Sequence, residues 1–402
     1  MEAMAIICEY NPFHNGHAYQ ISQHRSQYNV DCVIAVMSGN FVQRGAPAIC
    51  DKWVRAEMAL YGGCDLVVEL PVVYAVQSAE RFAQGAVRLI HQMPHVHYLS
   101  FGSECGDIVP LRTIAQTKRR PSFIAEVIHH SKTGIPYPTA CADVLCKMLG
   151  EDFRHILSEP NNILAIEYLK ALDEQNSNIT PITLKRTIAH HHNKIDEQFC
   201  SAGYLRSLMQ QHHDISSLMS PETYWVYKTA ERLGKTPVSN VALDVLVPYL
   251  LRTKTTDELL NIPDMTEGLE SRFREAGRKF HDLQSVAEFI KSKRYTRTRV
   301  DRMLTHLLLG ITKEDINLSP SYLRVLGMNR NGADYLKMIK EKSPVPIITK
   351  TTKCSELAPD AQKMFALDCH ATDIYAMLYP NQSQNRAGLD FITSPIIHQR
   401  GL

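Results

Sequence analysis

Two histidines stand three positions apart in the segment 9–17, which reads Glu-Tyr-Asn-Pro-Phe-His-Asn-Gly-His. His14 and His17 open a stretch of helical periodicity, so they share one face of its first turn. A helix N-terminus offers free backbone N–H groups and the positive end of the helix dipole, both of which favour phosphate. Two imidazoles there can donate hydrogen bonds to a phosphate in its transition state, and Gly16 leaves room for a base or ribose. The pattern indicates a nucleotide site rather than two surface histidines on a turn.

The elements that position His14 and His17 lie in the first hundred residues, where short apolar runs alternate with stretches of helical periodicity. Short apolar runs predict strands at 4–8, 32–37, 66–70 and 96–101, and helical periodicity predicts helices at 16–27, 51–61 and 79–91. Strands that are apolar throughout indicate a sheet covered on both faces. Their alternation with helices predicts an α/β fold with a Rossmann-like, doubly wound parallel sheet, whose ligands lie beyond the carboxyl ends of the strands. The segments at that edge are 9–17, 38–45 and 102–106.

The rest of the chain has mainly helical periodicity. Residues 110–174 predict helices, 181–188 predict a further strand, and the helical pattern resumes after Gly203. A polar, Ser- and His-rich stretch at 210–221 is the best domain boundary. We therefore expect a catalytic domain over 1–212 with a helical insertion at about 110–175, followed by a mainly helical domain over 213–402.

Composition excludes several classes of protein. The 402 residues contain 44 Lys plus Arg and 42 Asp plus Glu, a net charge of +2, so the chain is not basic throughout. The apolar run near 65–76 is interrupted by Glu69 and Pro71, and no uncharged stretch reaches the length of about 18 residues that spans a membrane. Ten scattered Cys without a Cys-x-x-Cys pair argue against a disulfide framework or a zinc site, and no signal peptide is evident. We expect a cytoplasmic protein with no membrane partner and no obligatory protein partner.

Basic residues nevertheless concentrate locally. The segment 291–302 holds six cations and one acid around Tyr295, and a second cluster is Lys118, Arg119 and Arg120. Such clusters attract phosphate backbones, and aromatic rings stack on unpaired RNA bases. The alternative is a solvated helix surface. The same two readings apply to Lys52 and Arg55, which lie three apart on a predicted helix.

Several motifs together resemble the bacterial tRNA(Met) cytidine acetate ligase family of the nucleotidyltransferase superfamily, which carries the His-x-Gly-His signature. The similar segments are 9–17, 37–45, 52–60, 65–71, 101–104, 160–164, 295–299 and 323–327. The resemblance implies a nucleotidyltransferase-type sheet and a ligase that uses ATP and acetate to form acetyl-AMP. It further implies acetylation of the wobble cytidine of elongator tRNA(Met) to N4-acetylcytidine, with Mg²⁺ as the accompanying cation.

The resemblance also assigns site residues. His14 and His17 would be catalytic, together with Ser201 and Arg206 of a phosphate loop in which this chain has Gly203 where the family usually has Thr. The implied ATP contacts are Ile7, Cys8, Glu9, Tyr10, Asn11, Pro12, Phe13, His14, Asn15, Gly16, His17, Gln20, Gly102, Asn161, Asn162 and Arg186. Without the family, Gly102 is an ordinary turn glycine as readily as a ligand contact, and the two Asn favour a helix cap. The expected tRNA contacts are Lys52, Arg55, Lys118, Arg119, Arg120, Lys293, Arg294, Arg297, Arg299 and Arg302.

The sequence also suggests a metal site and two other functions, each of which has a feature against it. His190, His191 and His192 suggest a metal, but neighbours on a strand point to opposite faces and zinc ligands at the usual spacing are missing, so we expect no metal site. A small-molecule adenylyltransferase would not need the basic helical half. A non-catalytic RNA-binding protein on a nucleotide-binding fold would not need both His14 and His17.

Overall fold

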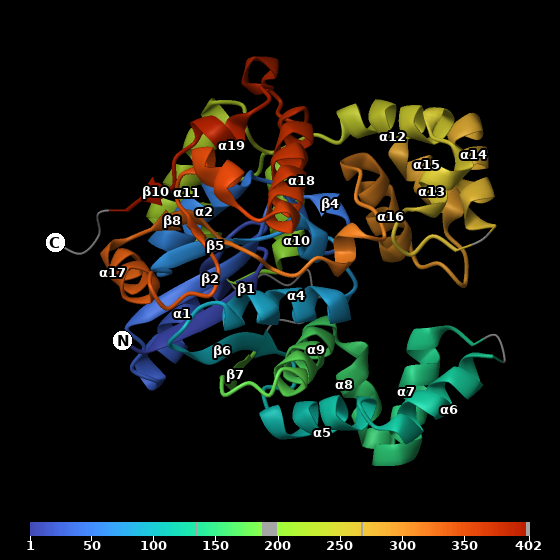
Figure 1. Cartoon of the computed structure of the whole chain (residues 1–402), viewed down its shortest axis with the longest axis horizontal. Helices are drawn as coiled ribbons and strands as arrows, with labels where there is room; N and C mark the ends of the chain where they lie inside the picture. Colours follow the sequence, from blue (N-terminus) through green and yellow to red (C-terminus); the bar gives the residue numbers. More distant parts are fainter. Residues whose placement is uncertain (133–134, 187–198, 267, 399–402) are drawn as a thin grey trace.

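A mixed, mainly parallel sheet of eight strands forms the centre of the computed structural model, which describes residues 1–132, 135–186, 199–266 and 268–398 (Figure 1). The strand order is β10-β8-β5-β2-β1-β6-β7, and β9 pairs with β8. The strands are β1 (Ala3–Cys8), β2 (Cys32–Ser38), β5 (Leu66–Leu70), β6 (Val96–Ser103), β7 (Thr180–Lys185), β8 (Leu323–Met328), β9 (Ile347–Ile348) and β10 (Ile396–Ile397). The predicted doubly wound α/β fold is confirmed.

Alternate residues of each central strand enter two different cores, because successive side chains of a strand point to opposite faces. Ala5 and Ile7 of β1 face a core built with α4 (Ala79–His91), α9 (Pro160–Glu174) and α18 (Pro359–Ala376). Met4 and Ile6 face the other core. That core includes α1 (Asn15–Gln27), α2 (Lys52–Tyr61), α10 (Ala202–Gln210) and α11 (Pro221–Arg232). Both faces of the sheet are covered, as the apolar strands predicted.

Two helical units flank the sheet in Figure 1. The predicted insertion is present between β6 and β7 and contains α5 (Ile108–Lys118), α6 (Pro121–Ser131), α7 (Tyr137–Leu149), α8 (Arg154–Ser158) and α9. The second unit has its own core, which includes Phe273, Val286 and Met303. It consists of α12 (Val241–Thr253), α13 (Thr256–Leu260), α14 (Leu269–Lys279), α15 (Leu283–Ile290) and α16 (Arg297–Leu309).

Residues 213–402 are mainly helical, as expected, but part of this stretch belongs to the central sheet. After α16 the chain returns to the central sheet, where β8 lies antiparallel to β5 and parallel to β9 and β10. Also in this part are α17 (Arg330–Ile339), the 3-10 turn Thr351–Glu356 and α19 (Leu389–Ile392). The separate helical unit is therefore α12–α16. The strand was hidden in the sequence because β8 is short and contains Arg324 and Gly327, which break the apolar pattern.

Within the described residues, none of the helices is both long enough and apolar enough to cross a bilayer.

Candidate active site

A cleft of about 790 Å³ opens at the carboxyl ends of β1 and β6. Chain order reverses there, because β2 and β5 lie on one side of β1 while β6 and β7 lie on the other. Doubly wound sheets bind their ligands at such a switch point. The expected ATP-site residues that line the cleft are Ile7, Cys8, Glu9, Tyr10, Asn11, His14, His17, Gln20, Gly102, Asn161 and Arg186, and Ser201 and Arg206 line it as well. Most of the predicted site is thus brought together in one place.

The two histidines form a reciprocal cap at the start of α1. His14 is the N-cap residue, and its Nδ1 accepts the Gly16 N–H at 3.1 Å, while Nδ1 of His17 accepts the His14 N–H at 3.2 Å. A neutral imidazole whose Nδ1 accepts must carry its proton on Nε2. The buried Nε2 of His14 has no hydrogen-bond partner in the described part of the chain. Both neutral rings therefore carry their proton on Nε2, and both residues line the cleft.

Both rings are neutral at physiological pH. Burial lowers the pKa of His14 to about 3, and the positive charges of Arg186 and Arg206 also lower it. The pKa of His17 lies well below its ordinary value, chiefly because of burial and then because of His14 and Arg186. The pair can therefore stabilise a phosphate as hydrogen-bond donors, while the neighbouring arginines supply positive charge.

Arg206 reaches the cleft from the first turns of α10. Ser201 is the N-cap of this helix, and its Oγ accepts the Tyr204 N–H at 3.2 Å. Nη1 of Arg206 donates to the Asn11 carbonyl at 2.7 Å, which ties α10 to the loop before α1. At Gly203 an added Cβ would meet Arg206 Nη2 at 3.8 Å and Ser201 Oγ at 3.9 Å. A threonine at this position would therefore fit beside both groups.

Arg186 follows β7 and lies against Gly102 at the end of β6. An added Cβ at Gly102 would stand 3.7 Å from Gln20 Oε1 and only 3.2 Å from Arg186 Cγ. The second distance is shorter than most contacts of a β-carbon. Gln20 is itself held by Ser100, whose Oγ accepts its Nε2 hydrogen at 2.8 Å. Gly102 therefore has a packing reason to lack a side chain, in addition to its place at the edge of the cleft.

The two asparagines at the start of α9 do not act as its cap. The Glu104 carboxylate accepts the backbone N–H groups of Asn161 at 3.3 Å and Asn162 at 2.9 Å, so Glu104 supplies the capping oxygen atoms. Asn162 is buried, and its Oδ1 accepts the Cys105 N–H at 3.0 Å. Asn161 lines the cleft, whereas Asn162 fixes the loop after β6.

Four residues of segment 9–17 do not line the cleft: Pro12, Phe13, Asn15 and Gly16. Phe13 belongs to the core on that side of the sheet and packs against Tyr10 and His17, with ring centroids 4.8 and 5.4 Å apart. Other residues line the cleft as well. Gln43 and Arg44 of the β3–β4 hairpin (Phe41–Val42 and Ala46–Pro47) lie in segment 38–45, which was expected at the ligand edge but received no assigned site residue. Phe82 and Tyr168 were not expected there. The hairpin carries a signal in the Asn-Phe-Val-Gln-Arg-Gly run after β2, while Phe82 and Tyr168 read only as core positions of helices.

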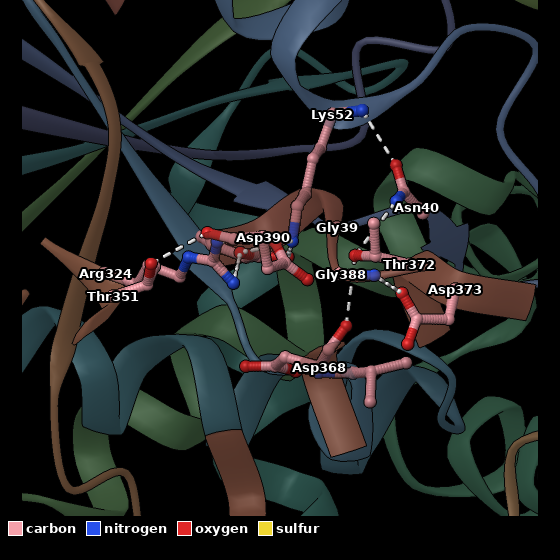
Figure 2. Close-up of polar contacts among 12 residues, drawn as sticks. Gly39, Asn40, Lys52, Arg324, Thr351, Asp368, Thr372, Asp373, Gly388 and Asp390 are labelled. Atoms are coloured by element: carbon pink, nitrogen blue, oxygen red, sulfur yellow. Dashed lines mark hydrogen bonds and ion pairs between the residues drawn. The ribbon is translucent and has the colours of Figure 1, made fainter. Parts of the chain in front are cut away.

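The prediction that Lys52 contacts RNA is wrong, because its side chain is fully buried. Its Nζ lies 2.9 Å from Glu69 Oε1 and 2.8 Å from Asp390 Oδ1. Arg324 from β8 pairs with the same two carboxylates. Its Nη1 lies 3.2 Å from Glu69 Oε2. Its Nη2 donates to Asp390 Oδ1 (Figure 2). The side chain of Asn40 accepts the Lys52 backbone N–H at 2.8 Å. The lysine thus neutralises a buried acidic pair that joins β5 to α19.

Arg55 is also buried and cannot contact RNA. Its guanidinium donates to backbone carbonyls only: Cys50 at 2.9 Å, Glu9 at 2.6 Å, Ser38 at 3.0 Å and Gly39. These contacts join the ends of β1 and β2. Helical spacing of cations could not distinguish such a position from a solvated one.

The basic residues of 291–302 are mostly accessible. Lys293 and Arg294 are exposed, and the guanidinium groups of Arg294 and Arg299 lie 5.6 and 5.1 Å from the centre of the Tyr295 ring. Arg297 forms ion pairs with Glu288 and Asp301, both at 2.8 Å. Arg302 is half-buried, and its Nε has no hydrogen-bond partner among the described residues.

This basic segment touches the rim of the cleft through Gly45. The Gly45 backbone has a φ of +74°, and an added Cβ would lie 2.4 Å from the Arg302 backbone nitrogen. Thr305 of α16 donates to the Gly45 carbonyl at 2.9 Å. Because Gln43 and Arg44 of the same hairpin line the cleft, the start of α16 and the cleft are neighbours.

The other basic cluster is partly engaged. Lys118 forms an ion pair with Glu167, and Arg119 lies 3.7 Å from Asp173, whereas Arg120 is exposed. His190, His191 and His192 lie outside the described residues. Among the residues that are described, no three His, Cys, Asp or Glu side chains are grouped so as to hold a metal ion.

Comparisons with known proteins agree with this geometry. Residues 1–390 match the model of the HIGH nucleotidyl transferase family. The chain is 43% identical to the tRNA(Met) cytidine acetate ligase of Thermoanaerobacter sp. strain X514 over 98% of both proteins. It is 37% identical to the enzyme of that name from Syntrophomonas wolfei, over 98% of this chain and 99% of the relative.

Solved structures give the same result. The crystal structure of Thermotoga maritima TmcAL in its apo form superimposes with a TM-score of 0.93 at 30% identity, over 99% of this chain and 100% of that one. The structure of Thermotoga maritima TmcAL bound with alpha-thio ATP gives a TM-score of 0.92 at 31% identity, over 99% of both chains.

Proposed function

Because this chain belongs to the HIGH nucleotidyl transferase family and, within it, to the tRNA(Met) cytidine acetate ligases, we propose that it joins acetate to tRNA at the expense of ATP. In the first step acetate attacks the α-phosphate of ATP, giving acetyl-AMP and pyrophosphate. In the second step N4 of the wobble cytidine of elongator tRNA(Met) takes the acetyl group, giving N4-acetylcytidine and AMP.

The observation that carries the first step is the convergence of four groups on one cleft. His14 and His17 present Nε2–H donors, and Arg186 and Arg206 bring positive charge to the same space. Attack at the α-phosphate spreads negative charge over its oxygen atoms, and fixed donors that meet this charge accelerate phosphoryl and nucleotidyl transfer. Neutral imidazoles suit the task because they donate without having to lose or gain a proton.

Magnesium enters this scheme as part of the substrate. Mg²⁺ in nucleotide sites is held largely by phosphate oxygens and water, with one or two carboxylates. Glu9 is the carboxylate that the described residues place in the lining of the cleft. The ion we expect is therefore bound through ATP rather than in a protein cage.

The second step requires RNA beside the cleft, and the basic start of α16 supports it. We assign tRNA contact to Lys293, Arg294, Arg297, Arg299 and Arg302, with Lys118, Arg119 and Arg120 as an outer cluster. The contact of Gly45 with Arg302 puts the inner group next to the cleft. A wobble base must leave its stack to react, and stacking surfaces such as Tyr295 favour single-stranded RNA.

Neither alternative from the sequence is favoured by an observation on the structure. A protein that only binds RNA gains nothing from two paired Nε2–H donors, and a small-molecule enzyme gains nothing from the cations of α16. We expect the ligase to act in the cytoplasm, on ATP, acetate and tRNA, without an obligatory protein partner.

The test uses the purified chain with ATP, labelled acetate and total tRNA, followed by digestion to nucleosides. The expected result is label in N4-acetylcytidine at the wobble position of elongator tRNA(Met), and none when ATP is omitted. Label in a free small molecule, or no label in any product, would contradict the proposal.

A further inference from the structure

Transfer of the acetyl group to cytidine releases a proton that the cleft has to accept. The exocyclic amine of cytosine is a weak nucleophile, and after it attacks a carbonyl it must lose one N–H proton. A general base must lie within hydrogen-bond reach of that amine. The candidates among the cleft-lining side chains are imidazole, thiol, phenol and carboxylate groups.

Most of these groups are unsuitable. In both His14 and His17, Nδ1 already accepts a backbone N–H, and the Nε2 position is a donor. Burial raises the pKa of the Cys8 thiol and of the Tyr10 and Tyr168 hydroxyls, so these groups keep their protons at neutral pH. Each of them can donate to a substrate, but none is an available base.

Glu9 differs from all of them. It is the one Asp or Glu among the described residues that line the cleft, and it follows directly on β1, at the edge where ligands bind. Its Oε1 accepts the Gln43 N–H at 3.0 Å, which fixes the carboxylate against the β3–β4 hairpin. No hydrogen bond to its Oε2 is made within the described residues, so this atom is available to a ligand.

A carboxylate at this position has an electrostatic cost. It repels the phosphates of a nucleotide in the same cleft, and like charges at short range oppose each other strongly in a partly buried site. Burial lowers the pKa of Arg206, while the nearby charge of Glu9 acts to raise it, so a guanidinium accompanies the acid. The hairpin that holds Glu9 is also the one that contacts α16 through Gly45. Glu9 is thus connected through this hairpin to the basic start of α16.

We propose that Glu9 is the general base of the acetyl-transfer step, an inference that rests on the proposed function. The lone pair of cytidine N4 attacks the acetyl carbonyl carbon and forms the N–C bond. The bond from that carbon to the phosphate oxygen breaks, and its electron pair leaves with AMP. The proton on N4 passes to Glu9 Oε2 and then to water.

The decisive variant is Glu9→Gln, measured in two separate assays. The amide oxygen of glutamine can still accept the Gln43 N–H, so the hairpin keeps its anchor. Acetate-dependent ATP–pyrophosphate exchange reports acetyl-AMP formation, and single-turnover transfer to tRNA reports the second step. We expect transfer to slow by about 10²–10⁴-fold, the usual contribution of a general base. Because Glu9 also lines the ATP cleft, exchange should slow as well, but by a much smaller factor than transfer.

Two further variants complete the design. Glu9→Asp keeps a carboxylate at shorter reach and should transfer faster than Glu9→Gln. Glu341→Gln removes an exposed acid and should leave both assays unchanged. Melting temperatures and tRNA affinities of the three variants are measured alongside, and those of Glu9→Gln should match wild type.

Three results would overturn the assignment. Wild-type transfer by Glu9→Gln would show that another group takes the proton. An equal loss in both assays would place Glu9 in nucleotide binding, and recovery of Glu9→Gln by excess Mg²⁺ would make it a metal ligand. If wild-type protein labels no tRNA, the proposed function itself fails, which is distinct from failure in the variant alone.

Discussion

The imidazole rings of His14 and His17 stack with their centroids 3.8 Å apart and an angle of 21° between their planes. Each ring accepts a backbone N–H of the same helical turn, so one turn of α1 sets both orientations. The two side chains that form the helix cap are therefore also the two that we propose as donors to the α-phosphate. A test of the donors must therefore preserve the cap.

His14→Asn meets that requirement, because asparagine is a favoured N-cap residue. We expect acetate-dependent ATP–pyrophosphate exchange to fall by about 10²–10³-fold, the usual effect of losing one transition-state donor. The melting temperature should stay close to that of wild type. His14→Ala is the comparison, since it removes donor and cap together and should also lower the melting temperature. Normal exchange in His14→Asn would remove His14 from the mechanism.

The lowered pKa of His14 makes stability depend on pH. The folded state holds this ring neutral down to about pH 3, whereas in the unfolded chain it takes up a proton below about pH 6.5. The unfolded state therefore binds more protons in this window, and stability falls as pH is lowered through it. Between pH 6.5 and 5 the His14 contribution to the free energy of unfolding should fall by about 1.6 kcal/mol. Urea unfolding of wild type and His14→Asn at both pH values measures this difference. An equal loss of unfolding free energy in the two proteins would contradict the prediction.

The Lys52→Met variant tests whether Lys52 stabilises the fold through a buried ion pair or contacts RNA. Removing the ammonium leaves Glu69 and Asp390 with Arg324 alone, and breaking a buried pair in this way costs about 3–5 kcal/mol. Denaturant unfolding should show that loss. Arg297→Ala is the matched control, because its partly exposed pairs with Glu288 and Asp301 are worth about 1 kcal/mol or less. A Lys52→Met protein of normal stability that binds tRNA poorly would restore the surface role.

Lys293→Ala combined with Arg294→Ala tests the basic segment. These side chains are exposed, so their loss should weaken tRNA binding and leave acetyl-AMP formation unchanged. Each lost phosphate contact should reduce the slope of log affinity against log salt by about 0.7–0.9. Filter binding at several salt concentrations gives the slope. An unchanged slope would show that tRNA does not bind at the start of α16.

Much of the central architecture follows from local pattern. The strands β1, β2, β5 and β6 are apolar throughout, and the helices between them have clear periodicity, so these elements and a cleft at the carboxyl ends of the strands could be predicted. Segment 9–17 could be placed at that cleft for the same reason, since it directly follows a strand. These features depend on residues that are close together in the sequence.

The other features could not be predicted, because they depend on contacts between residues that lie far apart in the sequence. Lys52 and Arg55 have the spacing of a solvated basic face, and only Glu69, Asp390 and the strand-end carbonyls show that they are buried. Glu104 caps α9 across 57 residues, which the sequence around Asn161 does not reveal. For β8, pairing with β5 gives Arg324 two carboxylates and makes a charged strand stable.

The late arrival of β8 in the sheet has a consequence for synthesis on the ribosome. The edge of β5 pairs with residues 324–328, so more than 250 residues must be made after β5 before that edge is covered. An open apolar strand edge is a site for pairing with other chains. Once synthesis has passed Ser207, the nascent protein contains all the residues that line the cleft, beside a sheet that is still unfinished. Chaperone dependence should end only when β8 has emerged.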